Sequence, residues 1–204
     1  MCDSAMLRHE LRRFVIYCIM RLPRQLLRFS PLVGVRISKN LSLGLFLYNL
    51  CIHLKPSVVV ETGTAFGVST SFILRALQDN GHGTLYSIDL PNATTSGRLD
   101  GKQTGYYIPK RLRHRWNLTL GDSRVELPKL LAQFNEIDLF IHDSLHTPEH
   151  MLFEYRTAWP LTKALVSDDV SLVWPECRQA FSTFAVPDRF AYRGKEFLLP
   201  FLSR

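Results

Sequence analysis

Short apolar runs alternate with amphipathic stretches from about residue 55 onward. This alternation is typical of a parallel sheet whose strands are joined by crossover helices. Five strands are expected in chain order, and a closing antiparallel hairpin adds two more. They cover residues 58–60, 84–89, 116–120, 137–142 and 165–166, with the hairpin at 190–192 and 196–198. The pattern therefore predicts an α/β fold with a doubly wound, seven-stranded, mostly parallel sheet.

Four helices are expected between these strands, each with an apolar face toward the sheet. They cover residues 68–79, 125–134, 148–159 and 176–184. Thr147 and Pro148 suit the cap and the first turn of the third helix. The polar segment 91–109, which contains glycines, is long for a connection inside a compact domain. We expect this segment to be a mobile lid that orders over a substrate.

The amino-terminal region has a different character. Its apolar residues between Leu7 and Leu22 recur at helical spacing, and six arginines against Asp3 and Glu10 give residues 1–30 a charge of +4 out of +7. We expect residues 1–50 to form a helical arm packed on the domain, 51–204, or on a second copy in a homo-oligomer. The apolar run 14–20 is too short to span a bilayer, which needs about 20 residues. Attachment to an anionic membrane surface stays open as the less favoured alternative.

Composition narrows the class of protein. The chain has 204 residues, of which 46% are hydrophobic and 21% are charged, as in one ordinary globular domain. Its four cysteines lie far apart and form no C-x-x-C pair, so we expect neither a zinc site nor a disulfide framework. Reduced thiols indicate a cytoplasmic protein. Because the excess positive charge lies in the arm, no nucleic-acid partner is expected.

Carboxylates follow all five parallel strands. In open α/β sheets, ligands bind at the carboxyl ends of the strands. A single acid there can be a cap or a turn former, but five strand ends in succession indicate a ligand site. The acids are Glu61, Asp89, Asp122, Asp143, Asp168 and Asp169.

The segment from Glu61 to Gly67 (ETGTAFG) resembles the glycine-rich first motif of class I S-adenosylmethionine-dependent methyltransferases, with Ala65 at the middle glycine position. Dinucleotide enzymes use a similar loop, and either family places an acid such as Asp89 on ribose hydroxyls. An acid after the third strand favours the methyl donor over NAD. The resemblance implies a set of cofactor-binding residues: Glu61, Gly63, Thr64, Ala65, Gly67, Ser69, Thr70, Asp89, Asp122, Ser123 and Asp143.

Residues 137–170 resemble the small bacterial family that contains macrocin O-methyltransferase, a branch akin to catechol O-methyltransferase. The segments ETGTAFGVST, SIDLP, GDS and DSLHT occur in that order between residues 61 and 181. The resemblance implies a Rossmann-like methyltransferase fold. It also implies a Mg²⁺ ion on Asp143, Asp168 and Asp169, whose oxygen donors suit this metal. His146 falls at the position of a proposed general base, a role that suits an imidazole.

The resemblance predicts metal-assisted O-methylation of a hydroxyl group on a small-molecule acceptor. The chain has 161–164 (LTKA) where the family has a Pro-Gly-Gly turn, which leaves the position of the fifth strand and its acids open. His142 and His150 are expected to be structural. Two alternatives remain: an NAD-dependent oxidoreductase on a similar fold, and a non-catalytic binding protein. The sequence does not identify the acceptor.

Overall fold

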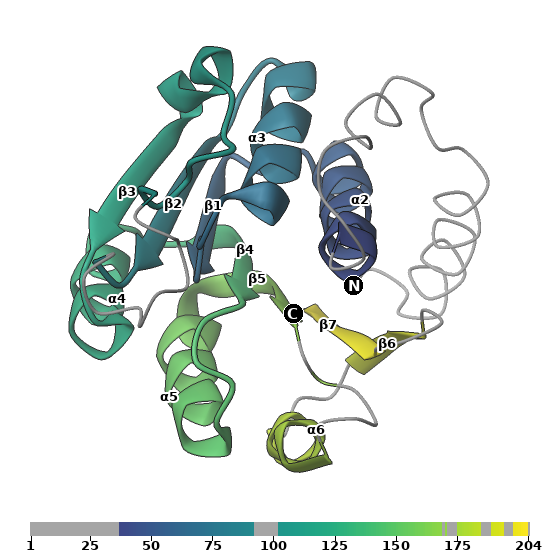
Figure 1. Ribbon diagram of the computed structural model, residues 1–204. Helices are drawn as coiled ribbons and strands as arrows, with labels where there is room; N and C mark the ends of the chain where they lie inside the picture. The colour runs from purple at the N-terminus through teal and green to yellow at the C-terminus, as the bar shows by residue number, and fades with distance from the viewer. Residues whose placement is uncertain are drawn as a thin grey trace.

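Seven strands form one sheet in the order β3-β2-β1-β4-β5-β7-β6. The computed structural model describes residues 37–91, 102–168, 170, 175–184, 189–193 and 198–203. Strands β1 to β5 are parallel, and β7 runs antiparallel to both of its neighbours, β5 and β6 (Figure 1). The predicted doubly wound, mostly parallel sheet is thus confirmed. The strands are β1 Val58–Thr62, β2 Thr84–Asp89, β3 Trp116–Leu120, β4 Ile137–His142, β5 Thr162–Ser167, β6 Arg189–Arg193 and β7 Leu198–Ser203.

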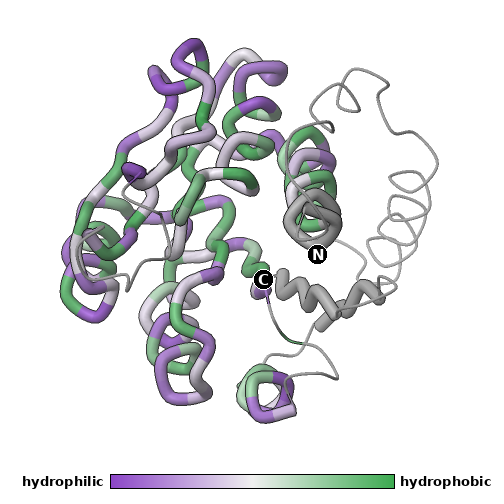
Figure 2. Tube along the Cα trace, in the orientation of Figure 1, coloured by the Kyte–Doolittle hydropathy of each residue, from purple (hydrophilic) through white to green (hydrophobic). Residues whose placement is uncertain are grey.

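Helices cover both faces of the sheet. One face carries α2 (Ile37–Leu54), α3 (Val68–Asn80) and the short helix η2 (Lys110–Arg115). The other carries α4 (Ser123–Leu131), α5 (Pro148–Ala158) and α6 (Pro175–Thr183), with η3 (Trp159–Leu161) leading into β5. Figure 2 shows hydrophobic residues in the central strands and hydrophilic residues in the outermost turns of α5. None of the helices among the described residues is long and apolar enough to cross a membrane.

The strand sequences divide the core into two clusters because successive side chains of a strand point to opposite faces. Val59 packs under α2 and α3, whereas its neighbour Val60 packs under α4 and α5. In β4, Leu139 and Ile141 join the first cluster and Phe140 joins the second. Continuous apolar runs are therefore needed in these central strands, which are buried on both faces.

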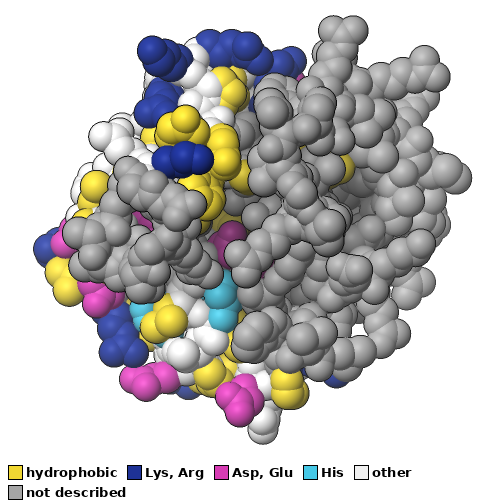
Figure 3. Space-filling model, in the orientation of Figure 1, with side chains coloured by type: hydrophobic (Ala, Val, Ile, Leu, Met, Phe, Trp, Pro, Cys, Tyr) yellow, Lys and Arg dark blue, Asp and Glu magenta, His cyan; other side chains and the backbone are white. Residues whose placement is uncertain are grey.

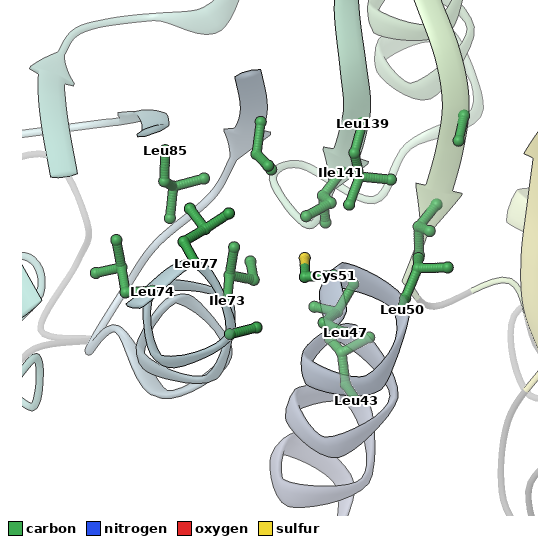
Figure 4. Packing of buried hydrophobic residues seen from close by; sticks show 14 of the residues in the cluster. Leu43, Leu47, Leu50, Cys51, Ile73, Leu74, Leu77, Leu85, Leu139 and Ile141 are labelled. Carbon is green, nitrogen blue, oxygen red and sulfur yellow. The ribbon is translucent and has the colours of Figure 1, made fainter. Parts of the chain in front are cut away.

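Helix α2 belongs to the domain core. Its side chains Leu43, Leu47, Leu50 and Cys51 lie on one face and point toward α3 and β4 (Figure 4). The helices approach closely at Gly44, where an added Cβ would collide with the Phe72 ring. The boundary expected between the arm and the domain, at residue 50, therefore falls inside α2. Residues of α2 before and after this position belong to the same core cluster. The amphipathic stripe predicted between Leu7 and Leu22 lies outside the described residues.

Strand β5 begins three residues earlier than predicted and pairs with β4 in parallel, with His142 opposite Ser167. Residues 161–164, which stand where the family has a Pro-Gly-Gly turn, are the last residue of η3 and the first three residues of β5. The pairing places the end of β5 beside the end of β4. Helix α4 begins two residues earlier than predicted because the Asp122 side chain caps it, accepting a 2.8 Å hydrogen bond from the Arg124 amide.

Candidate active site

The loop between β1 and α3 is shaped by three left-handed residues. Gly63 and Gly67 have φ angles of 87° and 81°, and Ala65 has a φ of 46°. A Cβ on Gly63 would collide with the Asp143 carbonyl oxygen, and one on Gly67 would collide with Ile108. Ala65 thus adopts the conformation that a glycine at its position would adopt, at a steric cost that glycine avoids.

Asp89, at the end of β2, holds this loop by its backbone. Its Oδ2 accepts hydrogen bonds from the amides of Thr64 at 3.1 Å and Ala65 at 2.6 Å. Its Oδ1 accepts a 2.8 Å bond from the Leu90 amide. A carboxylate has about four lone-pair sites, and the three amides leave about one of them, on Oδ1, for a hydroxyl of the ribose assigned to Asp89 from sequence.

Glu61 supports the loop from inside the protein and is only 1% exposed. Its Oε1 accepts hydrogen bonds from the hydroxyls of Thr70 at 2.8 Å, Thr64 at 3.2 Å and Ser87 at 2.7 Å. Burial raises the pKa of Glu61 to about 7. The hydroxyls of Thr64 and Thr70 therefore shape the loop, while Ser69 lies half-buried in the first turn of α3.

Two of the predicted metal ligands, Asp143 and Asp168, directly follow β4 and β5, and the predicted base His146 lies near the first of them. The Asp143 amide donates to the Thr62 carbonyl and the Asp168 amide to the His142 carbonyl, both at 2.9 Å. These bonds place both acids at the same edge of the sheet. His146 Nε2 lies 3.6 Å from Asp143 Oδ1. Figure 3 shows histidine and acidic side chains reaching the surface close together in the middle of one face.

The carboxylates of Asp143 and Asp168 offer hard oxygen donors for a cation. Asp168 is 6% exposed, and its buried Oδ1 has no hydrogen-bond partner among the described residues. The third predicted ligand, Asp169, lies outside them, and the described part of the chain contains no group of three metal-ligating side chains. An orphaned carboxylate oxygen fits Mg²⁺, which keeps several waters and needs few protein ligands. The three-acid Mg²⁺ site stays a prediction.

A buried polar cluster around Glu154 was not found from sequence. Its carboxylate contacts five polar side chains from four parts of the chain: Thr62, Ser123, His142, Ser144 and His150. The sequence signal that could have found this cluster is Glu154 itself, a charged residue on the inner face of the helix expected over 148–159. His142 and His150 are buried in this cluster, and burial lowers the pKa of His142. The Ser123 hydroxyl donates to Glu154, while Asp122 is exposed at the cap of α4.

Half of the expected lid is fixed to the glycine-rich loop. The Gly105 amide donates to the Ala65 carbonyl at 2.8 Å, and the Tyr107 amide to the Phe66 carbonyl at 2.9 Å. Ile108 is 3% exposed beneath them. Backbone bonds and an apolar anchor therefore hold residues 102–109 on the loop, and the ordering of 91–109 over a substrate stays a prediction. Residues 92–101 lie outside the described residues.

A family model described as a methyltransferase domain matches residues 60–170 of the chain. This match includes the glycine-rich loop and the ends of β2, β3, β4 and β5. A comparison with curated protein sequences gives no significant match.

Several solved structures are similar in fold. An O-methyltransferase from Bacillus cereus in complex with S-adenosylhomocysteine is 14% identical, with a TM-score of 0.61 over 94% of this chain and 91% of that one. CalS11, a TDP-rhamnose 3'-O-methyltransferase of calicheamicin biosynthesis, is 18% identical, with a TM-score of 0.60 over 100% and 96%. TomG from Streptomyces achromogenes, in complex with S-adenosylmethionine, is 16% identical, with a TM-score of 0.55 over 92% and 87%. At such identities the likeness shows a shared fold.

Proposed function

Since the chain belongs to the family of methyltransferase domains, we propose that it transfers a methyl group from S-adenosylmethionine to a hydroxyl of a small-molecule acceptor. One observation carries the proposal. The glycine-rich loop, clamped by Asp89, packs directly against the backbone of Asp143, beside His146. A donor held by the loop would therefore present its methyl group next to a carboxylate and an imidazole.

The donor half of the proposal rests on the loop and the strand ends around it. Left-handed turns at Gly63 and Gly67 let the backbone approach a ligand closely. Asp89 Oδ1, which accepts only from the Leu90 amide, has acceptor capacity left for a ribose hydroxyl, and Asp122 stands exposed at the end of β3, where the adenine is expected. Two of the solved neighbours hold S-adenosylhomocysteine or S-adenosylmethionine, which supports this donor for the present chain.

The acceptor half rests on His146 and Asp143. As the acceptor oxygen attacks the methyl carbon in line, the carbon–sulfur bond breaks and S-adenosylhomocysteine leaves. His146 accepts the hydroxyl proton, and Asp143, 3.6 Å away, stabilises the imidazolium that forms. A Mg²⁺ ion on Asp143, Asp168 and Asp169 would lower the pKa of the hydroxyl and orient it. The CalS11 neighbour supports a hydroxyl-bearing acceptor of small size.

Calorimetry with the unmodified protein tests the donor. We expect S-adenosylhomocysteine to bind in a one-to-one complex and NAD⁺ not to bind. Binding of NAD⁺ without binding of S-adenosylhomocysteine would favour the oxidoreductase alternative. Binding of the nucleoside without methyl transfer to any hydroxyl would favour the non-catalytic alternative.

Metal dependence is tested separately, with radiolabelled S-adenosylmethionine and a panel of phenols, catechols and nucleotide sugars. We expect transfer to fall in excess EDTA and to return with Mg²⁺. Asp168→Asn, which keeps the shape of the side chain, should remove both the activity and its response to Mg²⁺. Full activity in EDTA would end the metal-assisted form of the proposal and leave the methyltransferase itself standing.

A further inference from the structure

Glu154 lies at the centre of the largest buried polar cluster described above. Its residue is fully buried in the middle of α5, and each carboxylate oxygen has more than one partner. Oε2 accepts from the Thr62 hydroxyl at 2.5 Å and contacts His142 Nδ1 at 2.6 Å. Oε1 accepts from the hydroxyls of Ser123 at 2.5 Å and Ser144 at 2.9 Å, and lies 2.8 Å from His150 Nε2.

The hydrogen bonds of this cluster favour the charged form of the carboxylate. Burial by itself would raise the pKa of Glu154, but the hydrogen bonds from His142 and His150 outweigh burial and lower the pKa well below its usual range. Burying an ion is costly, and an apolar replacement of similar volume is often as stable or more stable. Stability alone therefore does not account for an ionised group at this position.

The partners of Glu154 stand next to the residues expected to bind the donor. Thr62 precedes Gly63 at the end of β1, and Ser144 follows Asp143 at the end of β4. Ser123 follows Asp122 at the start of α4. These positions belong to three separate segments, and two carboxylate oxygens connect all of them. The relative placement of the three segments is thus set at one point behind the loop.

We propose that Glu154 is a positioning residue for the donor site, which fixes the ends of β1 and β4 and the start of α4 relative to one another. The inference rests on the proposed function, because a donor must bind there for its placement to matter. Glu154 does not itself contact the donor and acts through Thr62, Ser123 and Ser144. A side chain that orients ligand-binding groups in this way is worth about 10–100-fold in affinity where such partners have been removed from metal sites.

Glu154→Gln is the direct test, because it keeps the shape and removes the charge and one acceptor. We expect the affinity for S-adenosylhomocysteine, measured by calorimetry, to fall by about 10-fold or more. Glu149→Gln is the matched control: it makes the same change on the same helix, at a side chain that is 86% exposed. The control should bind like the unmodified protein. Equal affinity for Glu154→Gln and Glu149→Gln would overturn the proposal.

A second pair of variants separates positioning from general destabilisation. Leu47→Ala removes buried volume in α2, remote from Glu154, and should lower Tm without changing donor affinity. If Leu47→Ala weakens binding as much as Glu154→Gln does, Glu154 is merely structural. Should Glu154→Gln fail to fold, Thr62→Val decides, because it removes one hydroxyl and keeps the side-chain shape. We expect roughly 2–10-fold weaker binding for Thr62→Val, and unchanged binding would overturn the proposal.

Hydrogen exchange without any ligand keeps this inference distinguishable from the proposed function. In Glu154→Gln, amide exchange should rise in peptides covering residues 62–67, 122–126 and 143–147 and stay unchanged in α2. Unchanged exchange in those three peptides would overturn the positioning role even if the donor binds. Raised exchange in a protein that binds no S-adenosylhomocysteine would refute the donor site and leave only a structural role for Glu154.

Discussion

Gly63 lies so close to Asp143 that a Cβ at position 63 would collide with the Asp143 carbonyl oxygen. The contact joins the turn after β1 to the end of β4, so the two segments that carry the expected donor loop and the expected catalytic acid touch through their backbones. A shift of either segment to admit a side chain would strain the 2.9 Å hydrogen bond from the Asp143 amide to the Thr62 carbonyl.

Gly63→Ala should therefore destabilise the protein strongly. The variant faces a φ of 87° and a collision with main-chain atoms, and we expect a loss of about 3 kcal/mol or more in the free energy of unfolding. Gly81→Ala is the control, because Gly81 has a φ of 79° with nothing within 4 Å of the added Cβ. The control should lose only about 1 kcal/mol. Urea denaturation measures both, and equal losses would contradict the close packing at Gly63.

Ala65→Gly should stabilise the protein. Ala65 is a non-glycine residue at a φ of 46°, and relief of the left-handed conformation outweighs the added freedom of the unfolded chain by about 0.5 kcal/mol. Lys55→Gly, at a φ of 49° and remote from the loop, should give a similar gain. Thermal unfolding of the two variants checks this, and a lower Tm for Ala65→Gly would mean that the alanine methyl contributes packing.

The architecture could be predicted from the sequence because its central strands carry unambiguous signals. Val58, Val59 and Val60 form a continuous β-branched run, which indicates a strand buried on both faces. Pro160 marks the end of the helix before β5. Element ends were less accurate where hydrogen bonds decide them. Asp122 starts α4 two residues early by capping it, and β5 is extended by pairing with β4.

The sequence predicts the parts of the site that depend on the residue type at a single position, and not the parts that depend on contacts between distant segments. Acids at strand ends indicate a ligand edge, and the structure does bring Asp143 and His146 together. The role of Glu154 depends on partners in three other segments, namely Thr62, Ser123 and the pair His142 and Ser144. No spacing rule joins Thr62 to a residue of α5. The anchoring of residues 102–109 depends likewise on backbone bonds to Ala65 and Phe66, which composition does not encode.

Asp89→Ala should weaken the binding of S-adenosylhomocysteine. The change removes the acceptor for a ribose hydroxyl and the clamp on the amides of Thr64 and Ala65. Leaving these polar groups unpaired costs about 1–3 kcal/mol, or roughly 5–150-fold in affinity. Asp79→Ala, at a surface carboxylate that pairs with Arg75, is the control and should bind normally. If Asp89→Ala binds as tightly as the unmodified protein in calorimetry, the ribose assignment is wrong.

The raised pKa of Glu61 should make stability depend on pH. The folded protein keeps this proton up to about pH 7, whereas the unfolded chain loses it near 4.5. Stability from Glu61 is therefore present at low pH and falls as pH rises from about 5 to 7.5, by about 2 kcal/mol. Glu61→Gln removes the titration. Denaturation is measured in EDTA at the lower and the upper end of this pH range. Between the two, the free energy of unfolding of the unmodified protein should fall by about 2 kcal/mol more than that of Glu61→Gln. Parallel pH profiles of the two proteins would contradict the raised pKa.

His146→Ala should lower methyl transfer by about 10²–10⁴ while leaving donor binding unchanged. This is the usual range for loss of a positioned base, and His146 is placed for that role beside Asp143 at the edge where β4 ends. The measurement is transfer from radiolabelled S-adenosylmethionine to whichever hydroxyl of the acceptor panel the unmodified protein methylates, with calorimetry of S-adenosylhomocysteine in parallel.

His114→Ala supplies the matched control, because His114 is exposed on η2 before β3, at the end of the sheet opposite the strand termini that carry the site. It should retain full transfer and full donor affinity. A loss of donor affinity in His146→Ala equal to its loss of transfer would make His146 a binding residue. Transfer at the unmodified rate in His146→Ala would exclude it as the base and point to a proton path through water at the carboxylates of Asp143 and Asp168.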